Sequence, residues 1–432
     1  MSNISCILYP PTLDFDYLVQ RPQQIMKSFS QLGTTSYYIN WPGPNMRRNK
    51  GIEQINPNFF LFNNVDPDPY LKEVNPVVYY TSAAHSDMIN NYQPALVVFD
   101  SVDEPSGEFE GWKPYYEHAV KTADVVLATS QKLFNMAKAL NANTYLIPNG
   151  CDYDYFSQAS TRTLPVPQEM QNLPRPIIGY IGVLATWCDF VLIDQMARNF
   201  PHYSFVMIGP KYNISDLPQQ PNLHWLGFKP YTELAYYTQM FDVGIIPFKL
   251  TSMVEAVNPI KMWEYMAVGM PVVTTALPEA KQYEGLIYYS NNYNEFFSNI
   301  TRALADTSPE RREQRMELAK RNSWRERAQQ IINIIENHLA AKGIDRSRPM
   351  PELKATLGKA SNRVGSYRID LAPSRQLTIS RGTSYKFRVG KTTAIIFGRK
   401  AGNKNATASR GTMIINSRVA FRYTTVRVRR SA

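Results

Sequence analysis

Short apolar runs alternate with longer amphipathic stretches over residues 1–330, and this alternation constrains the fold more than any other feature of the chain. The apolar runs have the length of buried β-strands, and the stretches between them are long enough for crossover helices. Strands and helices in alternation are typical of a parallel sheet covered by helices. The sequence therefore predicts an α/β fold, with strands at 5–9, 36–39, 59–62, 77–80, 96–99, 125–128, 144–147, 177–181, 204–208, 223–226, 243–246, 272–275 and 286–289.

A linker rich in Thr, Pro and Gln at 157–174 divides this series of strands into two sets. Two αβ domains joined by a polar linker is the simplest interpretation. We expect a first domain over 1–160 and a second over 161–325. The apolar residues of 326–343 recur with a helical period and predict a closing helix that packs back across both domains.

The formal net charge of +11 is concentrated at one end of the 432 residues. Residues 345–432 contain 20 of the 47 Lys and Arg residues and 3 of the 36 Asp and Glu residues, so the rest of the chain is mildly acidic. Basic sequence with few large apolar residues is typical of a flexible, solvated tail over 344–432. Attraction of the tail to an anionic lipid or polymer, and a small β module, remain as alternatives. Charge distributed in this way does not indicate a nucleic-acid-binding enzyme.

The cysteines and histidines do not indicate a disulfide framework or a metal site. Cys6, Cys151 and Cys188 are far apart and form no CxxC motif, and the five histidines include no HExxH motif. We expect a protein of the reducing cytoplasm. The first residues lack the apolar core of a signal peptide, and no run of about 18 apolar residues follows. Any membrane contact is therefore expected at the inner face of the membrane.

The segment 241–279 contains the clearest candidate site. Its first apolar run predicts a buried strand, and a loop then leads to a helix with Asn258 as N-cap, Pro259 at the first helical position and Gly269 as C-cap. Open parallel sheets bind ligands beyond the carboxyl ends of their strands, where helix N-termini attract anions. A diphosphate would suit this position.

Two charged residues of the same helix fit such a ligand. Lys261 would add a positive charge beside a diphosphate, and Glu264 could accept hydrogen bonds from ribose hydroxyls. An ordinary helical surface pair between Lys261 and Glu264 is the alternative.

Five segments of the chain resemble, in order and spacing, the group 1 glycosyltransferases, also called glycosyltransferase family 4, which have the GT-B fold. The resemblance covers about residues 95–305. It implies two Rossmann-like domains that face each other across a cleft, the first for the acceptor and the second for a nucleotide-sugar donor. The segments are IPNGCDYDYF (147–156), IIGYIG (177–182), FVMIGP (205–210), PNLHWLGFKPYTELAYY (221–237) and NPIKMWEYMAVGMPVV (258–273).

The resemblance assigns the donor-binding residues. Glu264 matches the second glutamate of the family's Glu-x7-Glu motif, which contacts the donor ribose. The first glutamate, near the sugar, has Glu255 as its candidate, although Glu255 precedes Glu264 by nine positions instead of eight. Phe228 follows a strand end where such enzymes hold the nucleobase by backbone contacts.

The arginine that commonly follows the family's GxxG strand is missing, because the chain continues from Val183 to Asp189 without a basic residue. The diphosphate must then be bound by Lys261, by backbone N–H groups near Gly182 and near the helix start at Asn258, and by Lys211 or Lys249. Stabilisation of the leaving group by the helix dipole and a lysine would be the main electrostatic contribution to catalysis.

The first domain has less specific signals. Arg21 precedes Pro22 at a predicted helix start, close to the loop after the first strand. We place Arg21 with Glu255 and Lys261 in the catalytic set, and a structural salt bridge of Arg21 remains the alternative. Asp100, Asp103 and Ser130 lie near strand ends that would open on the cleft. His85 and His118 are interpreted as structural.

The resemblance implies transfer with retention of anomeric configuration, without a metal ion or a cofactor. A UDP-sugar donor of hexose type and a glycan or lipid-linked acceptor are the first expectations, since similar bacterial proteins build cell-wall and capsular polysaccharides such as teichuronic acids. A partner subunit that binds nucleotide or glycan without catalysis is the alternative function. A metal-dependent GT-A transferase is a further alternative, raised by three Asp-x-Asp triplets at 14–16, 66–68 and 152–154, which turn chemistry explains more simply.

Overall fold

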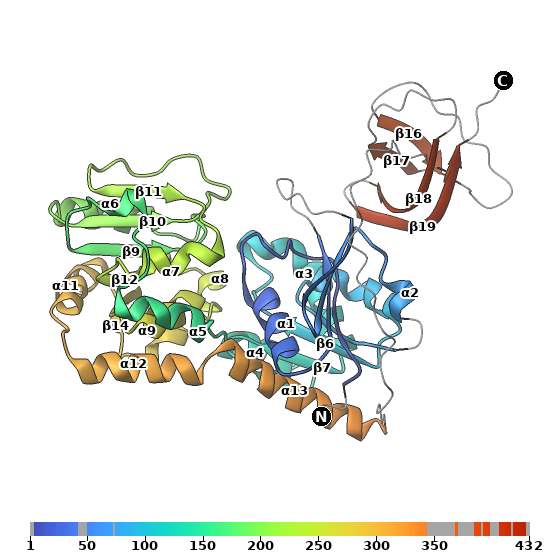
Figure 1. The fold of residues 1–432 in the computed structure, drawn as a ribbon, viewed down its shortest axis with the longest axis horizontal. Helices are drawn as coiled ribbons and strands as arrows, with labels where there is room; N and C mark the ends of the chain where they lie inside the picture. The colour runs from blue at the N-terminus through green and yellow to red at the C-terminus, as the bar shows by residue number, and fades with distance from the viewer. Residues whose placement is uncertain are drawn as a thin grey trace. The chain divides into compact units, whose positions relative to one another are not determined.

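The computed structural model describes residues 4–41, 50–71 and 74–343, and beyond them only the backbone of five strands. Contacts between Cα atoms group the chain into two units, Met1–Leu357 and Gly358–Ala432. The first unit contains both predicted series of strands and helices, which form two domains with a sheet each (Figure 1).

The sheet of the first domain has eight strands in the order β3-β4-β2-β1-β5-β6-β7-β8. All neighbouring pairs are parallel except β3 and β4. Successive residues of β1 face opposite sides of the sheet: Ile7 and Tyr9 belong to one apolar cluster and Leu8 to the other. The strands are β1 (Ile7–Tyr9), β2 (Ser36–Asn40), β3 (Gly51–Asn56), β4 (Phe59–Asn63), β5 (Val77–Tyr80), β6 (Leu96–Ser101), β7 (Val125–Ala128) and β8 (Thr144–Leu146).

The sheet of the second domain has six parallel strands in the order β11-β10-β9-β12-β13-β14. Apolar side chains cover both of its faces, as the uninterrupted apolar runs of the sequence predict for a parallel sheet. The strands are β9 (Ile177–Ile181), β10 (Ser204–Ile208), β11 (Leu223–Gly227), β12 (Val243–Ile246), β13 (Val272–Thr275) and β14 (Tyr288–Ser290).

The predicted strands of both domains are present, with small shifts at their ends, and the α/β class is confirmed. The sequence analysis missed β3. This strand is the antiparallel edge of the first sheet, and only Ile52 in it is buried, so it lacks the apolar run that identified the other strands.

The last two helices connect the domains. α12 packs against α9 in the second domain, and α13 returns to the first domain and packs against α1 (Figure 1). As its periodicity predicts, α13 buries one face, which contains Trp324, Ile331 and Ile335. The α-helices are α1 (Arg21–Gln31), α2 (Asp68–Leu71), α3 (Lys113–Thr122), α4 (Gln131–Lys138), α5 (Tyr153–Phe156), α6 (Phe190–Asn199), α7 (Leu234–Thr238), α8 (Ser252–Glu255), α9 (Ile260–Val268), α10 (Pro278–Lys281), α11 (Tyr293–Leu304), α12 (Pro309–Arg321) and α13 (Trp324–Ala341).

Short 3-10 helices occupy several of the connections. One of them, η2, lies on the first-domain side of the junction between the domains. They are η1 (Ala83–Tyr92), η2 (Gly107–Trp112), η3 (Ser157–Thr161), η4 (Gln168–Met170) and η5 (Tyr231–Glu233).

The second unit has five described strands, namely β15 (Arg368–Ile369), β16 (Ser384–Val389), β17 (Thr392–Phe397), β18 (Ala406–Ile415) and β19 (Arg418–Val428). β15, β19 and β18 form one antiparallel sheet, and β16 and β17 form another. The expectation of a flexible tail rests largely on residues that lie outside the described ones.

Cys6, Cys151 and Cys188 are all free thiols and are buried. None of the described helices combines the length and the apolar character that a bilayer-spanning helix needs.

Candidate functional site

A cavity of about 390 Å³ lies between the two domains. Residues that follow β1, β5 and β6 line one side of it, and residues that follow β9, β10 and β12 line the other. All six are carboxyl ends of parallel strands, where open α/β sheets bind their ligands. The cavity therefore occupies the position that the sequence predicts for a ligand. Lining residues from these strand ends include Thr12, Leu13, Thr81, Val102, Asp103, Gly182, Val183, Gly209, Pro210 and Phe248.

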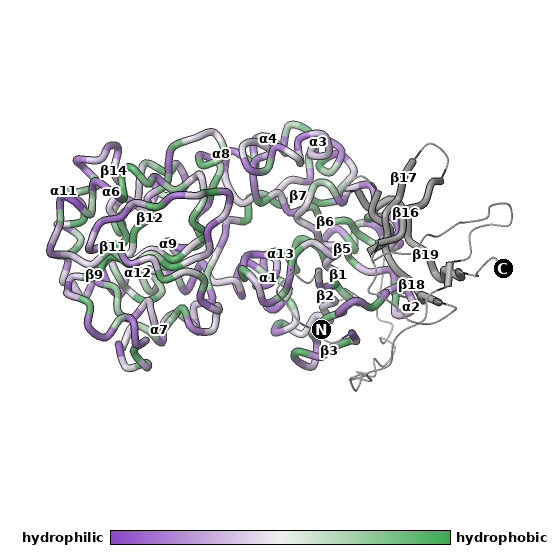
Figure 2. The backbone as a smooth tube through the Cα atoms, turned by 90° about the horizontal axis from the view of Figure 1, so that it is seen from above, coloured by the Kyte–Doolittle hydropathy of each residue, from purple (hydrophilic) through white to green (hydrophobic). Residues whose placement is uncertain are grey.

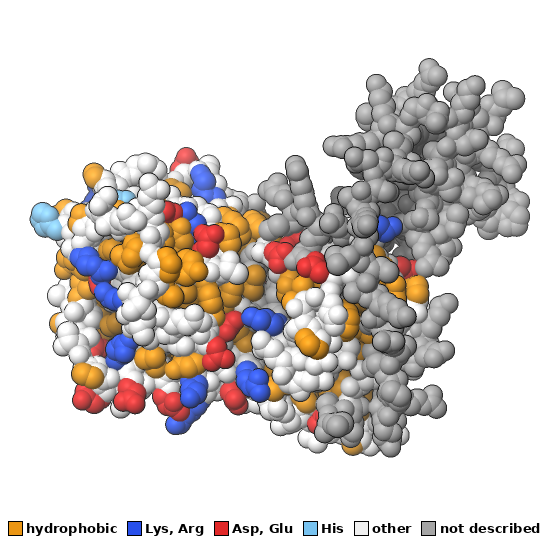
Figure 3. All heavy atoms as spheres, viewed as in Figure 1, with side chains coloured by type: hydrophobic (Ala, Val, Ile, Leu, Met, Phe, Trp, Pro, Cys, Tyr) orange, Lys and Arg blue, Asp and Glu red, His pale blue; other side chains and the backbone are white. Residues whose placement is uncertain are grey.

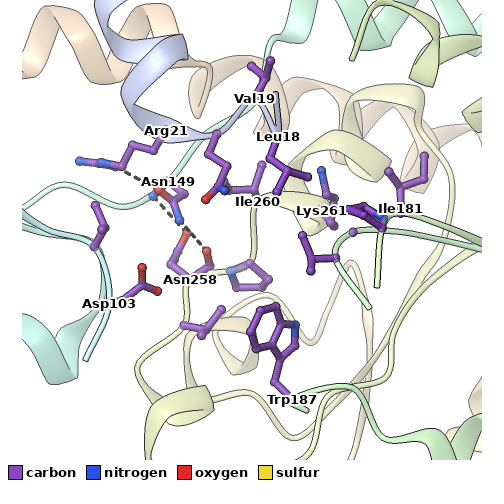
Figure 4. A pocket seen from close by; sticks show the side chains of 18 of the residues that line it. Leu18, Val19, Arg21, Asp103, Asn149, Ile181, Trp187, Asn258, Ile260 and Lys261 are labelled. Carbon is purple, nitrogen blue, oxygen red and sulfur yellow. Dashed lines mark hydrogen bonds between the residues drawn. The ribbon is translucent and has the colours of Figure 1, made fainter. Parts of the chain in front are cut away.

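The start of α9 forms part of the cavity wall. Pro259, Ile260 and Lys261 line the cavity, and Figure 4 shows Lys261 opposite Asp103 of the first domain. Lys261 Nζ lies 2.7 Å from Glu264 Oε2, and the Glu264 side chain is buried and does not line the cavity. Burial raises the pKa of Glu264, and the charge of Lys261 opposes that rise. The pair that the sequence analysis left as the alternative is therefore present, with Glu264 buried instead of at the surface. The ribose contact of Glu264 stays a prediction.

The predicted N-cap of α9 is wrong by one residue. The N-cap is Pro259, with extended backbone, and the helix begins at Ile260. Asn258 lines the cavity, but its side chain is used elsewhere: Oδ1 accepts the backbone N–H of Asn149 at 3.1 Å, and Nδ2 donates to Glu279 Oε2 at 3.3 Å. Asn258 thus connects the second domain to the segment between the domains. Gly269 ends the helix with φ 81°, as predicted for its C-cap.

Gly182 and Gly209 allow two strand ends to approach each other in the cavity floor. Gly209 has φ +150°, and a Cβ atom there would lie 1.8 Å from the Gly182 carbonyl oxygen. A Cβ atom on Gly182 would lie 2.4 Å from the hydroxyl oxygen of Tyr180. Only glycine fits both positions, so the backbone itself forms this part of the wall. The Gly182 N–H donates to the Ile208 carbonyl oxygen at 2.8 Å, which leaves the ligand-facing role to neighbouring groups.

Arg21 lines the cavity from the first domain, but its guanidinium group is engaged in a salt bridge. Nε and Nη2 donate to the two carboxylate oxygens of Asp100 at 2.6 and 3.2 Å, and Nη1 donates to Pro148 O and Asn149 Oδ1 at 3.1 and 3.2 Å. Tyr79 donates a further hydrogen bond to Asp100. Figure 4 shows Arg21, Asn149 and Asn258 in one line of hydrogen bonds. The structure thus shows the salt bridge that the sequence analysis left as the alternative for Arg21.

Asp103 is a carboxylate that faces the cavity from the first domain. It follows β6, at the strand end that the sequence analysis named, and Figure 4 shows it across the cavity from Lys261. Burial raises the pKa of Asp103 to about 7, and the negative charge of Asp100 contributes to the rise. A carboxyl group with such a pKa changes its charge near neutral pH, which is typical of residues at functional sites.

Like Glu264, the predicted site residues Glu255 and Lys211 do not line the cavity. Glu255 is at the end of α8, with 53% of its side chain exposed, and its carboxylate lies 3.5 Å from Lys132 Nζ. Lys211 is exposed, and its ammonium group lies 3.4 Å from the Ser215 carbonyl oxygen. Phe228, in contrast, lines the cavity, and its ring lies 5.2 Å from the ring of Tyr17.

The sequence analysis missed Lys229 as a cavity residue. Lys229 follows Phe228 directly, so its place after a strand end could have been noticed. Its Nζ lies 2.5 Å from Glu169 Oε1 and 5.2 Å from the centre of the Tyr237 ring. Aromatic side chains besides Phe228 also line the cavity, and the sequence analysis did not name them as site residues. They are Phe109, Trp112, Tyr180, Trp187, Tyr231 and Phe248.

His85, His118 and the Asp-x-Asp triplets each have partners within the protein. His85 Nδ1 lies 3.2 Å from Thr12 Oγ1, and burial lowers the pKa of His85 to about 4. His118 is at the surface near Asp87. The first aspartate of each triplet accepts a backbone N–H within its own turn, as turn chemistry predicts. The described residues contain no group of three or more potential metal ligands.

Contacts between the domains flank the cavity. α4 of the first domain lies beside α8 of the second, as Figure 2 shows, and Lys132 Nζ donates to Ser252 O at 2.7 Å. Gln131 N donates to Glu279 Oε1 at 2.7 Å. On the η2 side, Glu108 accepts a hydrogen bond from Thr186 at 2.8 Å. The two domains are therefore in contact with each other beside the cavity.

Residues 175–306 match the family model described as Glycosyl transferases group 1. This segment contains β9 to β14, α9 and the second-domain side of the cavity. The segment is similar to the group 1 glycosyltransferases.

A curated protein is similar to this chain over about half of its length. TuaH of Bacillus subtilis (strain 168), named as a teichuronic acid biosynthesis glycosyltransferase, is 27% identical over 219 residues, which is 48% of this chain and 55% of TuaH. The chain thus spans about half the length of this curated relative.

Solved structures align over both domains. Sucrose-phosphate synthase from Thermosynechococcus elongatus aligns with a TM-score of 0.58 at 15% identity, over 78% of this chain and 100% of that protein. HepE of Anabaena, solved with UDP and glucose, aligns with a TM-score of 0.57 at 14% identity, over 77% of this chain and 99% of HepE. Together with the two parallel sheets, these alignments show that the chain has the GT-B fold of glycosyltransferases.

Proposed function

We propose that this protein transfers a sugar from a nucleotide-sugar to an acceptor hydroxyl in the cavity between its two domains. The observation that carries the proposal is the cavity itself: it lies at the carboxyl ends of both sheets, inside a GT-B fold, and Lys261 and the start of α9 face it. The donor is a UDP-sugar of hexose type, and the acceptor is a glycan or a lipid-linked glycan. Support for these substrates comes from HepE, which was solved with UDP and glucose, and from the name of TuaH.

The donor diphosphate would bind at the start of α9. The positive end of the helix dipole and the ammonium group of Lys261 would stabilise the negative charge that develops on the leaving diphosphate. Glu264 holds Lys261 in place from behind, because its buried carboxylate lies 2.7 Å from Lys261 Nζ. Lys229 is a second cation on the same wall. With these groups in place, the proposed transfer is metal-independent.

The acceptor would approach from the first domain. Asp103 faces the cavity there and can accept a hydrogen bond from an acceptor hydroxyl when it is ionised. We assign the proton of that hydroxyl to the departing diphosphate, which acts on the same face as the attacking oxygen and so retains the anomeric configuration. The aromatic rings around the cavity offer apolar faces for the sugar rings of donor and acceptor.

The raised pKa of Asp103 predicts how kcat/KM depends on pH. The ionised form is needed to accept the hydrogen bond, so kcat/KM should rise with pH through about 7, the raised pKa of Asp103. Asp103→Asn should reduce kcat/KM by about 10- to 100-fold, the range expected for one hydrogen bond to a charged group. It should also remove the rise near pH 7. Asp87→Asn, at an exposed surface pair with His118, serves as the matched control and should keep the profile. A profile unchanged in Asp103→Asn would contradict the assignment.

The test of the proposed function is nucleotide release from a panel of UDP-, GDP- and dTDP-sugars by the full chain, with and without acceptor and with EDTA present. We expect release from one nucleotide class, and release that survives EDTA. Binding of a nucleotide without turnover would favour a non-catalytic partner subunit. One observation favours that second candidate: Arg21 is the sole arginine among the described residues that line the cavity, and it is held in a salt bridge.

A further inference from the structure

A second cavity lies in the second domain, at the opposite edge of its sheet. Its volume is about 560 Å³, and it is lined by residues that precede β9, β12 and β13, together with the ends of α9 and α11 and the start of α12. These are amino ends of strands, so this cavity is separate from the one at the carboxyl ends. Its size is within the range of small-molecule sites.

Four arginines and two aspartates supply the charged groups of this cavity. They are Arg162, Arg175, Arg312 and Arg315, with Asp242 and Asp306. Positive groups thus outnumber negative ones two to one in a concave site. Figure 3 shows basic and acidic side chains intermixed along the neighbouring edge, where α12 runs.

Both aspartates accept hydrogen bonds from donors of the protein. Asp242 Oδ1 lies 3.1 Å from Arg162 Nη2 and 2.6 Å from Arg175 Nη1, and its Oδ2 accepts the N–H of Ile177 at 2.8 Å. Asp306 Oδ2 lies 2.8 Å from Arg315 Nη1 and 3.0 Å from Arg311 Nε. The carboxylates therefore position Arg162, Arg175 and Arg315.

The arginines, in contrast, have N–H donors that the described residues do not use. A guanidinium group has five N–H donors. Within the described residues, Arg162 and Arg175 each bond through a single terminal nitrogen, and Arg312 bonds through Nη2 to the Ser160 carbonyl oxygen at 2.7 Å. The side chains of Arg162 and Arg175 are 51% and 43% exposed, so their free donors are open to solvent. Arg312 has no carboxylate partner in this part of the chain.

The start of α12 adds to the same electrostatic field. Thr307 and Ser308, which is the N-cap of this 13-residue helix, line the cavity. The positive end of the helix dipole therefore acts at the site where the arginines converge. Guanidinium groups bind oxyanions with paired, planar hydrogen bonds, and several of them together suit a ligand with more than one negative charge.

From these observations we propose that the amino-edge cavity of the second domain, with Arg162, Arg175 and Arg312, binds a multivalent phosphate compound. This site is distinct from the donor cavity and is independent of the sugar transfer proposed above. Two phosphoryl groups in one ligand would use the donors of Arg162 and Arg175 on one side and those of Arg312 on the other.

Isothermal titration of the full chain with inorganic pyrophosphate tests this proposal. Because pyrophosphate can also enter the donor cavity, the titrations are made in a Lys261→Gln background. Binding should persist in Lys261→Gln, and the Kd should rise at least tenfold when Arg162→Gln and Arg175→Gln are added. Arg198→Gln, a surface arginine paired with Asp194 outside both cavities, is the matched control and should leave the Kd unchanged. Inorganic phosphate, with a single phosphoryl group, should bind at least tenfold more weakly than pyrophosphate.

A second variant covers the case in which the double substitution disturbs folding by leaving Asp242 unpaired. Arg312→Gln removes a donor from the site without breaking an ion pair, so its melting temperature should stay the same while its Kd rises. The proposal is overturned if pyrophosphate does not bind in the Lys261→Gln background. It is also overturned if Arg312→Gln binds pyrophosphate as tightly as its background, or if Arg198→Gln weakens binding to the same degree. These binding measurements do not depend on turnover. Their outcomes can therefore be interpreted even if the protein turns over no nucleotide-sugar.

Discussion

Replacement of Lys261 with glutamine is expected to reduce nucleotide-sugar turnover by about 100- to 1,000-fold, the size of effect seen when one preorganised group that stabilises developing negative charge is removed. The physical reason is position: Lys261 faces the cavity at the start of α9, and it is held there by the buried carboxylate of Glu264. Steady-state kinetics on the preferred donor, with kcat and KM reported separately, measures the loss.

Several variants separate this role from a structural one. Lys261→Arg keeps the charge and should retain part of the turnover, and Lys281→Gln, at an exposed position on α10, should behave as the unmodified protein. Glu264→Gln removes the group that positions Lys261 and should have a smaller effect than Lys261→Gln. Full turnover in a folded Lys261→Gln protein would exclude Lys261 from the leaving-group site.

Replacement of Arg21 with methionine is expected to lower the free energy of unfolding by about 3–5 kcal/mol, the usual cost of breaking a buried ion pair by removing one partner. The Arg21 side chain is 3% exposed and the Asp100 side chain is 0% exposed, so Asp100 would be left as a buried charge that keeps the hydrogen bond from Tyr79. Burial acts to lower the pKa of Arg21, but the charges and hydrogen bonds of Asp100 and Tyr79 together outweigh it, and the pKa of Arg21 is raised. Urea unfolding monitored by circular dichroism gives the change in free energy.

The same helix supplies a control for Arg21. Lys27 on α1 pairs with Asp152 at 3.3 Å, but its side chain is 42% exposed, so Lys27→Met should cost less than about 1 kcal/mol. The double variant Arg21→Met with Asp100→Asn should cost less than the sum of the two single variants, because no buried charge is then left alone. An Arg21→Met protein as stable as Lys27→Met would show that the salt bridge does not stabilise the first domain.

Much of the fold follows from local sequence. A strand such as β12 or β13 is a continuous apolar run bounded by polar residues, and burial on both faces of a parallel sheet demands that pattern. The sequence analysis missed edge strand β3 because a strand that is exposed to solvent at the edge of a sheet needs no continuous apolar run. The predicted start of α9 was wrong by one residue. Asn258 has a side chain suited to an N-cap, but it forms hydrogen bonds with Asn149, which is 109 positions away.

The candidate site was likewise predicted only in part from the sequence. Lys261, Gly182 and Phe228 line the cavity as expected, since each directly follows a strand end or begins a helix in its own segment. Glu255 and Lys211 do not, because their side chains turn to solvent and to nearby partners. Whether a residue beside a cavity points into it depends on side-chain packing that its own segment does not specify.

The sequence by itself therefore determined the α/β class, the strands of two parallel sheets, and the helix that presents Lys261, because these depend on apolar periodicity and helix signals within a few residues. Only the tertiary structure decided that Arg21 is bound to Asp100 and Asn149, that Asp103 faces Lys261 across the cavity, and that four arginines meet at the other edge of the second sheet. Each of these arrangements joins residues that are far apart in the chain. Their distances are set by how distant segments of the chain pack together, and local sequence does not specify that packing.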